Sequence, residues 1–192
     1  MKRIRHVLVA ALSVMALAAA AAPPALVSAA REQTMSRVIY DGTYAGIAYP
    51  MGDVPANRGV CTDVIIRAYR AVGIDLQVLV HEDMRTNFAL YPRIWGLTKP
   101  DTNIDHRRVP NLQKFLERAG AGVRISRNEG DYLAGDIVTW MLPGNLPHIG
   151  IVSDRRPPNG RPLIIHNIGA GPVEDDILFE YPITGHYRYK VQ

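Results

Sequence analysis

The residues best suited to chemistry in this chain are its only cysteine, Cys61, and two histidines, His148 and His166. Cys61 stands immediately before a predicted helix over 62–72, where the helix dipole and free backbone N–H groups lower a thiol pKa and can bind an oxyanion. His148 opens a predicted strand over 148–153, which is a rigid support for a general base. His166 follows on a neighbouring predicted strand and can hold the His148 imidazole in one tautomer. These positions predict a Cys–His–His triad.

Other interpretations of the same residues remain open. A lone cysteine is often a small buried hydrophobe, and Asp63, in the same helical turn as Cys61, opposes formation of the thiolate. One cysteine and two histidines can also bind zinc, although no short C-x-x-C or H-x-x-x-H spacing supports such a site. Asn167, on the opposite strand face from His166, is a weaker third member. We predict no metal and no other cofactor, with zinc as the alternative.

A polar stretch over 92–109 contains two adjacent arginines, Arg107 and Arg108. Either guanidinium group could clamp a substrate carboxylate through a pair of parallel hydrogen bonds. In the alternative interpretation this stretch is a solvated loop. Asp63 and Asn167 are the other residues that we expect to contact a substrate.

The elements that must position these residues change character half-way along the chain. Apolar residues recur at helical spacing over 62–72 and 76–90, and in a helix that Pro110 opens and Gly120 closes. Extended patterns dominate afterwards. The expected strands are a short one over 38–40 and a series over 123–126, 135–142, 148–153, 162–168 and 185–191. Helices followed by a meander of strands predict an α+β fold, with an antiparallel sheet of about five strands packed against the first helix.

The N-terminus predicts export. Three basic residues precede an apolar run over 7–22, and small residues at 27–29 fit a signal-peptidase site, so we assign 1–29 to a signal peptide and 30–192 to one domain. Without the three basic residues, 19 Lys and Arg face 18 Asp and Glu, so no basic surface predicts nucleic-acid binding. We expect a periplasmic or secreted protein without a stable membrane anchor after cleavage. Its single cysteine cannot form a disulfide within the chain.

Two stretches resemble the NlpC-type, papain-like cell-wall cysteine peptidases. The helix from Cys61 to Tyr69 ends in Arg-Ala-Tyr as theirs often does, and Gly-Asp-Ile-Val at 135–138 followed by His-Ile-Gly-Ile at 148–151 resembles their two strands. Val-Cys-Thr-Asp at 60–63 departs from their Asp-Cys-Ser-Gly. The segments GVCTDVIIRAYR, DTNIDHRRVPNL, GDIVTWMLPGNLPHIGIVSD, IIHNIG and ITGHYRY also resemble an exported bacterial family known as a domain of unknown function.

These resemblances imply a papain-like fold and a cysteine hydrolase that cleaves a peptide or amide bond. Cys61 would be the nucleophile, His148 the base and His166 the orienting residue. The implied partner is peptidoglycan, through its stem peptides, or another peptide of the cell envelope. The alternative is a catalytically inactive module of the same fold that binds cell-wall peptide or glycan.

Overall fold

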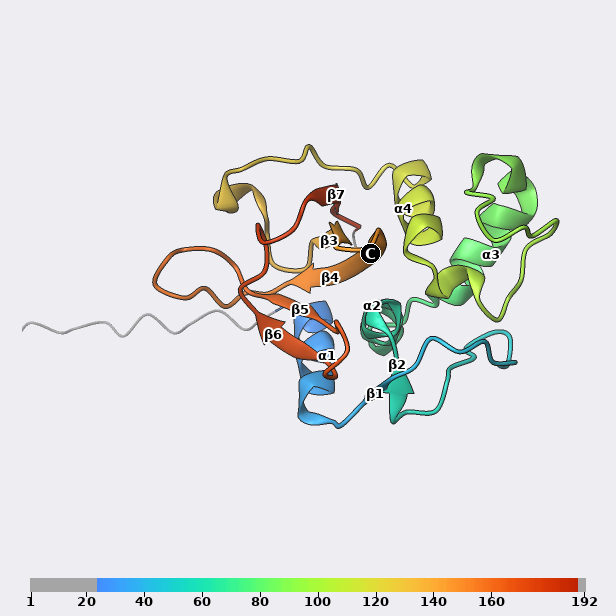
Figure 1. The fold of residues 1–192 in the computed structure, drawn as a ribbon, viewed down its shortest axis with the longest axis horizontal. Helices are drawn as coiled ribbons and strands as arrows, with labels where there is room; N and C mark the ends of the chain where they lie inside the picture. Colours follow the sequence, from blue (N-terminus) through green and yellow to red (C-terminus); the bar gives the residue numbers. More distant parts are fainter. Residues whose placement is uncertain (1–23, 190–192) are drawn as a thin grey trace, which may run out of the picture.

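The computed structural model describes residues 24–189. Its centre is a five-stranded antiparallel sheet in the order β6-β5-β4-β3-β7 (Figure 1). The strands are β3 (Ile137–Leu142), β4 (Leu146–Val152), β5 (Ile164–His166), β6 (Val173–Asp175) and β7 (Ile183–Tyr187). The α+β prediction with a sheet of about five antiparallel strands is therefore confirmed.

The hairpin that carries His148 forms as its sequence predicts. β3 and β4 pair from Ile137↔Ile151 to Leu142↔Leu146, and the turn between them contains Gly144 and Asn145 at positive φ. Both residue types tolerate this backbone region better than others do. The tight turn fixes the register, and the register determines which side chains of β4 face the helices.

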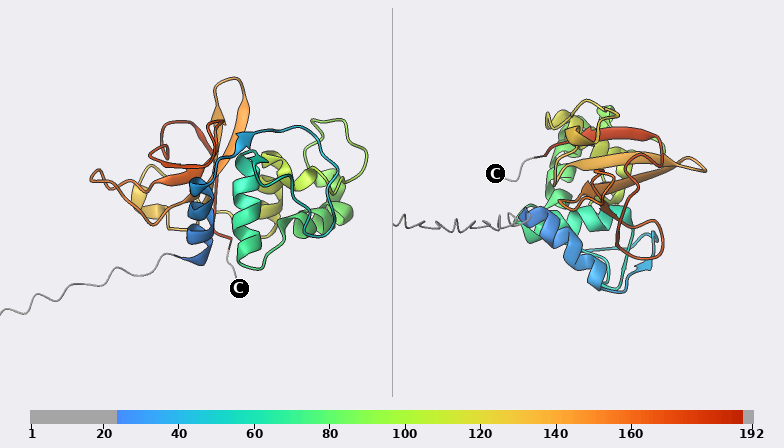
Figure 2. Two further views of the ribbon diagram at one scale, coloured as in Figure 1. Left: turned by 90° about the horizontal axis from the view of Figure 1, so that it is seen from below. Right: turned by 90° about the vertical axis from the view of Figure 1, so that its left-hand side faces the viewer.

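Four α-helices are present among residues 24–189: α1 (Ala25–Glu32), α2 (Cys61–Ala71), α3 (Leu76–Asn87) and α4 (Val109–Arg118). A two-residue parallel ribbon, β1 (Ile39–Tyr40) with β2 (Arg58–Gly59), precedes α2. Figure 2 shows the helices gathered on one side of the sheet. None of the described helices is long and apolar enough to span a membrane.

The sheet separates two apolar clusters. Ile149, Ile151 and Ile165 pack with the helices on one face. Trp140 and Val152 belong to the second cluster, on the opposite face, which loops and short 3-10 turns cover. The alternation of a strand explains this division, because neighbouring residues of β4 point to opposite faces.

The helix α2 begins at Cys61 for a local reason. The Asp63 carboxylate accepts the backbone N–H of Val60 at 2.7 Å, which satisfies one of the groups that a helix start leaves unpaired. The helix ends before Gly73, which adopts φ +86°. Both ends agree with the predicted span of 62–72 to within one residue.

Some predicted elements differ from the structure. Residues 123–126 do not form a strand; Val123 donates its N–H to the carbonyl of His186, and the segment then leaves the sheet. The fifth strand is instead β6, whose short Val-Glu-Asp sequence has no extended apolar pattern. The predicted loop over 92–109 contains a 3-10 turn, η3 (Asp105–Arg107), which is buried among α2, α3 and α4.

The expected domain boundary falls inside α1. Residues 1–23, with most of the predicted signal peptide, lie outside the described residues. Leu26, Val27 and Ala30 are buried in the main core, and α1 packs against α2. A division between residues 29 and 30 would cut this helix and remove Leu26 and Val27 from the core.

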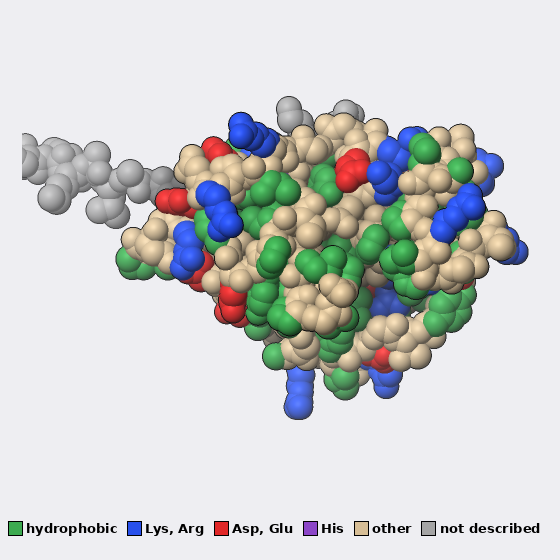
Figure 3. Space-filling view, turned by 45° about the horizontal axis from the view of Figure 1, so that its top comes forward, with side chains coloured by type: hydrophobic (Ala, Val, Ile, Leu, Met, Phe, Trp, Pro, Cys, Tyr) green, Lys and Arg blue, Asp and Glu red, His purple; other side chains and the backbone are tan. Residues whose placement is uncertain are grey.

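Surface charge agrees with the near-neutral balance of residues 30–192. Figure 3 shows Lys and Arg side chains scattered over the face that it displays, with acidic side chains between some of them and no continuous basic patch. Many of the arginines are engaged in ion pairs, such as Arg67 with Asp53 and Arg118 with Asp83.

Candidate active site

Cys61 is the first residue of α2, and its side chain is only 4% exposed. Burial raises the pKa of the thiol to about 11, and the charge of Asp63 adds to the rise. The backbone N–H groups of Ile149, Thr62 and Cys61 itself interact with the sulfur and act in the opposite direction. Burial prevails, so the thiol is protonated at neutral pH.

His148 and His166 are in direct contact. Nε2 of His148 lies 3.2 Å from Nδ1 of His166, and the two rings are nearly perpendicular, at 88°. Burial lowers the pKa of His148 to about 3 and that of His166 to about 4. Both imidazoles are therefore neutral at pH 7, with one ring donating to the other.

The thiol lies against β4 at the residue that follows His148. The sulfur meets the N–H of Ile149, whereas the His148 ring lies on the other face of the strand, 5.8 Å from the ring of Trp140. No hydrogen bond joins the thiol to the His148 ring among residues 24–189. Nδ1 is the ring nitrogen of His148 that the His166 contact leaves available. Catalytic hydrogen bonds are often long before substrate binds and tighten in the complex.

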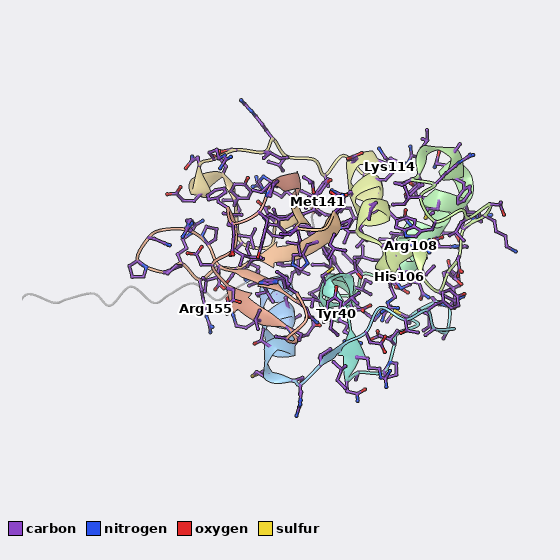
Figure 4. The ribbon with its side chains drawn as sticks, viewed as in Figure 1. Tyr40, His106, Arg108, Lys114, Met141 and Arg155 are labelled. Carbon is purple, nitrogen blue, oxygen red and sulfur yellow. The ribbon has the colours of Figure 1, made fainter. Side chains whose placement is uncertain are left out.

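Tyr40 covers the thiol and was not singled out from the sequence. Partial burial and the nearby thiol raise the pKa of Tyr40 to about 12, while the residue stays 44% exposed. The β1–β2 pairing holds Tyr40 opposite Gly59, two residues before Cys61. Figure 4 shows Tyr40 beside α2, and Figure 2 (left) shows β1 and the turn of the β3–β4 hairpin at the same end of that helix. The only sequence signal was a predicted short strand over 38–40.

Asp63 and Arg107 form a buried, two-pronged ion pair. The Nε and Nη2 groups of Arg107 donate to the two carboxylate oxygens at 2.8 and 2.9 Å, and the side chains are 2% and 3% exposed. The Thr62 hydroxyl donates to the Arg107 carbonyl at 3.0 Å. In this structure the fork of Arg107 is occupied by Asp63, and the Asp63 carboxylate faces Arg107. The contact of either residue with a substrate stays a prediction.

Arg108 is also engaged within the fold. Its guanidinium lies 4.2 Å from the ring centre of Trp95, and Nη1 is 3.6 Å from Asp105. Figure 4 shows Arg108 and His106 on the side of α2 toward α3 and α4. Asp105, His106 and Arg107 are all buried, so the alternative of a solvated loop is wrong for this part of 92–109.

Asn167 follows β5 and is completely buried. Its Oδ1 accepts the N–H of Gly169 at 2.9 Å, which fixes the start of the loop over 167–171. That loop passes close to Val38, since a Cβ added at Gly171 would lie 3.3 Å from the Val38 carbonyl oxygen. The amide nitrogen of Asn167 has no partner. Asn167 therefore shapes the loop facing the Tyr40 segment, and its contact with a substrate stays a prediction.

Two further features bear on ligands. Among the described residues, no three His, Cys, Asp or Glu side chains are grouped as a metal site requires. A cavity of about 850 Å³ lies beside β7, where Arg124, Arg127 and Arg188 contribute to its lining. The lining of that cavity includes neither Cys61 nor the two histidines, so it is separate from the candidate active site.

Comparisons with known proteins place these residues in a family context. A family model described as a domain of unknown function (DUF1287) matches residues 27–189. The chain is also 54% identical over 168 residues to the uncharacterized protein YijF of Escherichia coli (strain K12), which covers 88% of this chain and 82% of that protein. The matched span starts within α1 and includes Cys61, His148 and His166.

Proposed function

Taking as a premise that the chain belongs to the DUF1287 family of domains of unknown function, we propose that it is an exported cysteine hydrolase with a papain-like fold. Cys61 is the nucleophile, His148 the base and His166 the residue that orients the base. The reaction is cleavage of a peptide or amide bond. The substrate class is the stem peptide of peptidoglycan, which follows from the resemblance to cell-wall peptidases and from the predicted signal peptide.

One observation carries the proposal. The chain's only thiol lies at the first turn of α2 and meets the N–H of Ile149, the strand residue next to His148, and His148 is hydrogen-bonded to His166. A thiol, an imidazole and an orienting group are the components of covalent acyl transfer, and here the thiol and the His148 ring lie at neighbouring residues without touching. A purely structural core would gain little from two neutral histidines buried in edge-to-face contact one strand residue away from a buried thiol.

The mechanism starts from a neutral site. A carbonyl group enters beside the start of α2 and displaces Tyr40 from the thiol. In the proposed complex the start of β4 rearranges to bring the His148 ring to the thiol. Nδ1 of His148 then takes the thiol proton as the carbon–sulfur bond forms, and His166 accepts the Nε2–H of His148. The free N–H groups of the first turn, including that of Cys61, bind the oxyanion. His148 then protonates the leaving amine, and water hydrolyses the thioester.

The decisive experiment is digestion of purified peptidoglycan followed by mass spectrometry of the released fragments. The wild-type protein should release peptide fragments, and Cys61→Ala and His148→Gln should each reduce the rate by at least about 10³-fold. Arg127→Gln, an exposed change at the separate cavity, is the matched control and should retain the wild-type rate. A Cys61→Ala protein that still releases the same fragments would eliminate the cysteine mechanism.

A second candidate is an inactive module that binds cell-wall peptide or glycan. The observation that favours it is the neutral, buried thiol beneath Tyr40, because this state is far from a reactive thiolate. In that case the protein should sediment with purified peptidoglycan sacculi but release no fragments. Cys61→Ala should then bind as tightly as wild type.

A further inference from the structure

A pocket of about 320 Å³ lies beside the segment that covers Cys61. Asp41, Thr43, Tyr44 and Arg58 contribute to its lining. Asp41 directly follows the thiol-covering Tyr40. Arg58 stands three residues before Cys61, so the Cα atoms of the two residues are at most about 10 Å apart. The pocket therefore lies within reach of a short peptide whose scissile bond is at the thiol.

The Arg58 guanidinium keeps unused donors. Its Nη1 donates to Asp41 at 2.6 Å, which is the one hydrogen bond of this guanidinium within residues 24–189. The side chain is 53% exposed. A guanidinium has five N–H donors in a planar fork that fits a carboxylate. Most of the Arg58 fork is thus free and accessible at the pocket.

Neighbouring arginines do not offer the same group. Arg107 is buried against Asp63, and Arg67 donates to Asp53 and to the backbone carbonyl of Arg58. These two fasten the start of α2 and the β2 strand in place. Among the arginines of this region, Arg58 is the one that combines a free fork with exposure.

Asp41 limits what the pocket can accept. Hydrogen bonds from Thr43 and Arg58 lower the pKa of Asp41 to about 2, so its carboxylate is ionised at neutral pH. This charge holds Arg58 at the pocket and competes with any second carboxylate for its donors. Removing the charge should therefore strengthen the binding of an acidic ligand.

We propose that this pocket binds a carboxylate of the substrate through Arg58, which makes the protein selective for acidic peptides. The inference rests on the proposed hydrolase function and specifies its substrate class. An extended peptide spans about 10 Å in about three residues. The recognised carboxylate therefore lies within about three residues of the bond that is cut. Arg58 is a specificity residue and not a member of the reacting triad.

The test compares soluble peptidoglycan stem peptides that carry free carboxylates with the same peptides after amidation. Hydrolysis is measured for wild type, Arg58→Gln and the control Arg127→Gln. Equilibrium binding is measured separately with Cys61→Ala and with Cys61→Ala/Arg58→Gln, which do not depend on turnover. Wild type and Arg127→Gln should prefer the free carboxylates by about 10-fold or more, as expected for a hydrogen bond between charged groups.

Arg58→Gln should lose that preference through a higher KM for the free peptides, whereas Arg127→Gln should keep the wild-type preference. Asp41→Asn should increase the preference. If Cys61→Ala discriminates between the peptides but wild type cleaves neither, the pocket assignment stands and the hydrolase proposal fails. If wild type cleaves both peptides equally, or Arg58→Gln still discriminates, the pocket assignment is wrong. It is also wrong if neither peptide binds.

Discussion

Loss of the Arg107 guanidinium should destabilise the fold, and not only weaken substrate binding. Arg107→Gln leaves the Asp63 carboxylate buried at the first turn of α2 with the Val60 N–H as its remaining donor. Breaking one partner of a buried ion pair costs about 3 to 5 kcal/mol. For a domain of this size, each 1 kcal/mol lowers the melting temperature by roughly 2 to 4 °C. The expected decrease is therefore about 6 to 20 °C.

Thermal unfolding followed by circular dichroism measures this effect, with Arg85→Gln as the matched control. Arg85 pairs with Glu82 on the surface of α3, where the side chains are 66% and 48% exposed. Such an exposed pair is screened by solvent and contributes little to stability, so the control should melt close to wild type. The double variant Asp63→Asn/Arg107→Gln should recover part of the lost stability, because it removes the uncompensated charge.

The opposite result would show that the contact in the structure does not hold the fold together. If Arg107→Gln melts within about 2 °C of wild type while the KM for an acidic substrate rises, Arg107 is available to the substrate. The original clamp hypothesis would then replace the assignment of Arg58. A large loss of stability with no recovery in the double variant would mean that Asp63 and Arg107 act independently of each other.

Three other outcomes follow from burial. Alkylation of Cys61 by iodoacetamide should rise with pH up to about 11 in the folded protein, but level off near the ordinary value of about 8.5 in urea; a folded-state plateau below 8.5 would instead indicate a thiolate–imidazolium pair. Burial lowers the pKa of three histidines, to about 3 for His148 and about 4 for His106 and His166. Because the unfolded state takes up these protons near pH 6.5 and the folded state does so only near pH 4 or below, the free energy of unfolding is highest above pH 6.5 and decreases as the pH falls toward 4. Each histidine should contribute about 2 kcal/mol less at pH 5, and a melting temperature that is equal at pH 7 and 5 would contradict this. Finally, a chain beginning at Ala30 should be about 3 to 6 kcal/mol less stable than one beginning at Ala25, because it lacks two buried core side chains; equal urea midpoints would show that α1 is dispensable.

Local patterns in the sequence predicted the elements that carry the proposed triad. Helical spacing and Gly73 defined α2, and Pro-Gly-Asn after an apolar run defined the β3–β4 turn. The hydrogen bond between His148 and His166 also follows from local information, since adjacent antiparallel strands place them two register positions apart on one face. These features depend on neighbours in the chain or on neighbouring strands.

The environment of Arg107 could not be predicted in the same way. Its stretch is polar and contains prolines, which is typical of an exposed loop. Burial of η3 results from the packing of α2, α3 and α4 around it, and its partner Asp63 is 44 residues away. No spacing rule links two such residues. Tyr40 was missed for a related reason, because its contact with the thiol depends on a parallel ribbon of only two residues in each strand.

The N-terminal boundary illustrates a different difficulty, in which two signals overlap. Small residues at 27–29 satisfy the rule for signal-peptidase cleavage, and the same residues form a helix whose Val27 is fully buried. A sequence rule for processing contains no information about packing. The structure supplies that information, because α1 contacts both α2 and β4. If cleavage occurs, a site before Ala25 is the one that preserves the packed helix.

Because the resting site is neutral, the reactivity of Cys61 toward alkylating reagents and its activity in hydrolysis are separate properties. A thiol with a pKa of about 11 beneath Tyr40 should react slowly with small alkylating reagents, whether or not it is catalytic. A bound substrate differs from such a reagent because it can displace Tyr40, bring its carbonyl to the first turn of α2 and exclude water. Formation of thiolate and imidazolium in the complex is then favoured by their mutual attraction. Slow alkylation therefore counts against a resting ion pair and not against hydrolysis, which the release of peptidoglycan fragments decides.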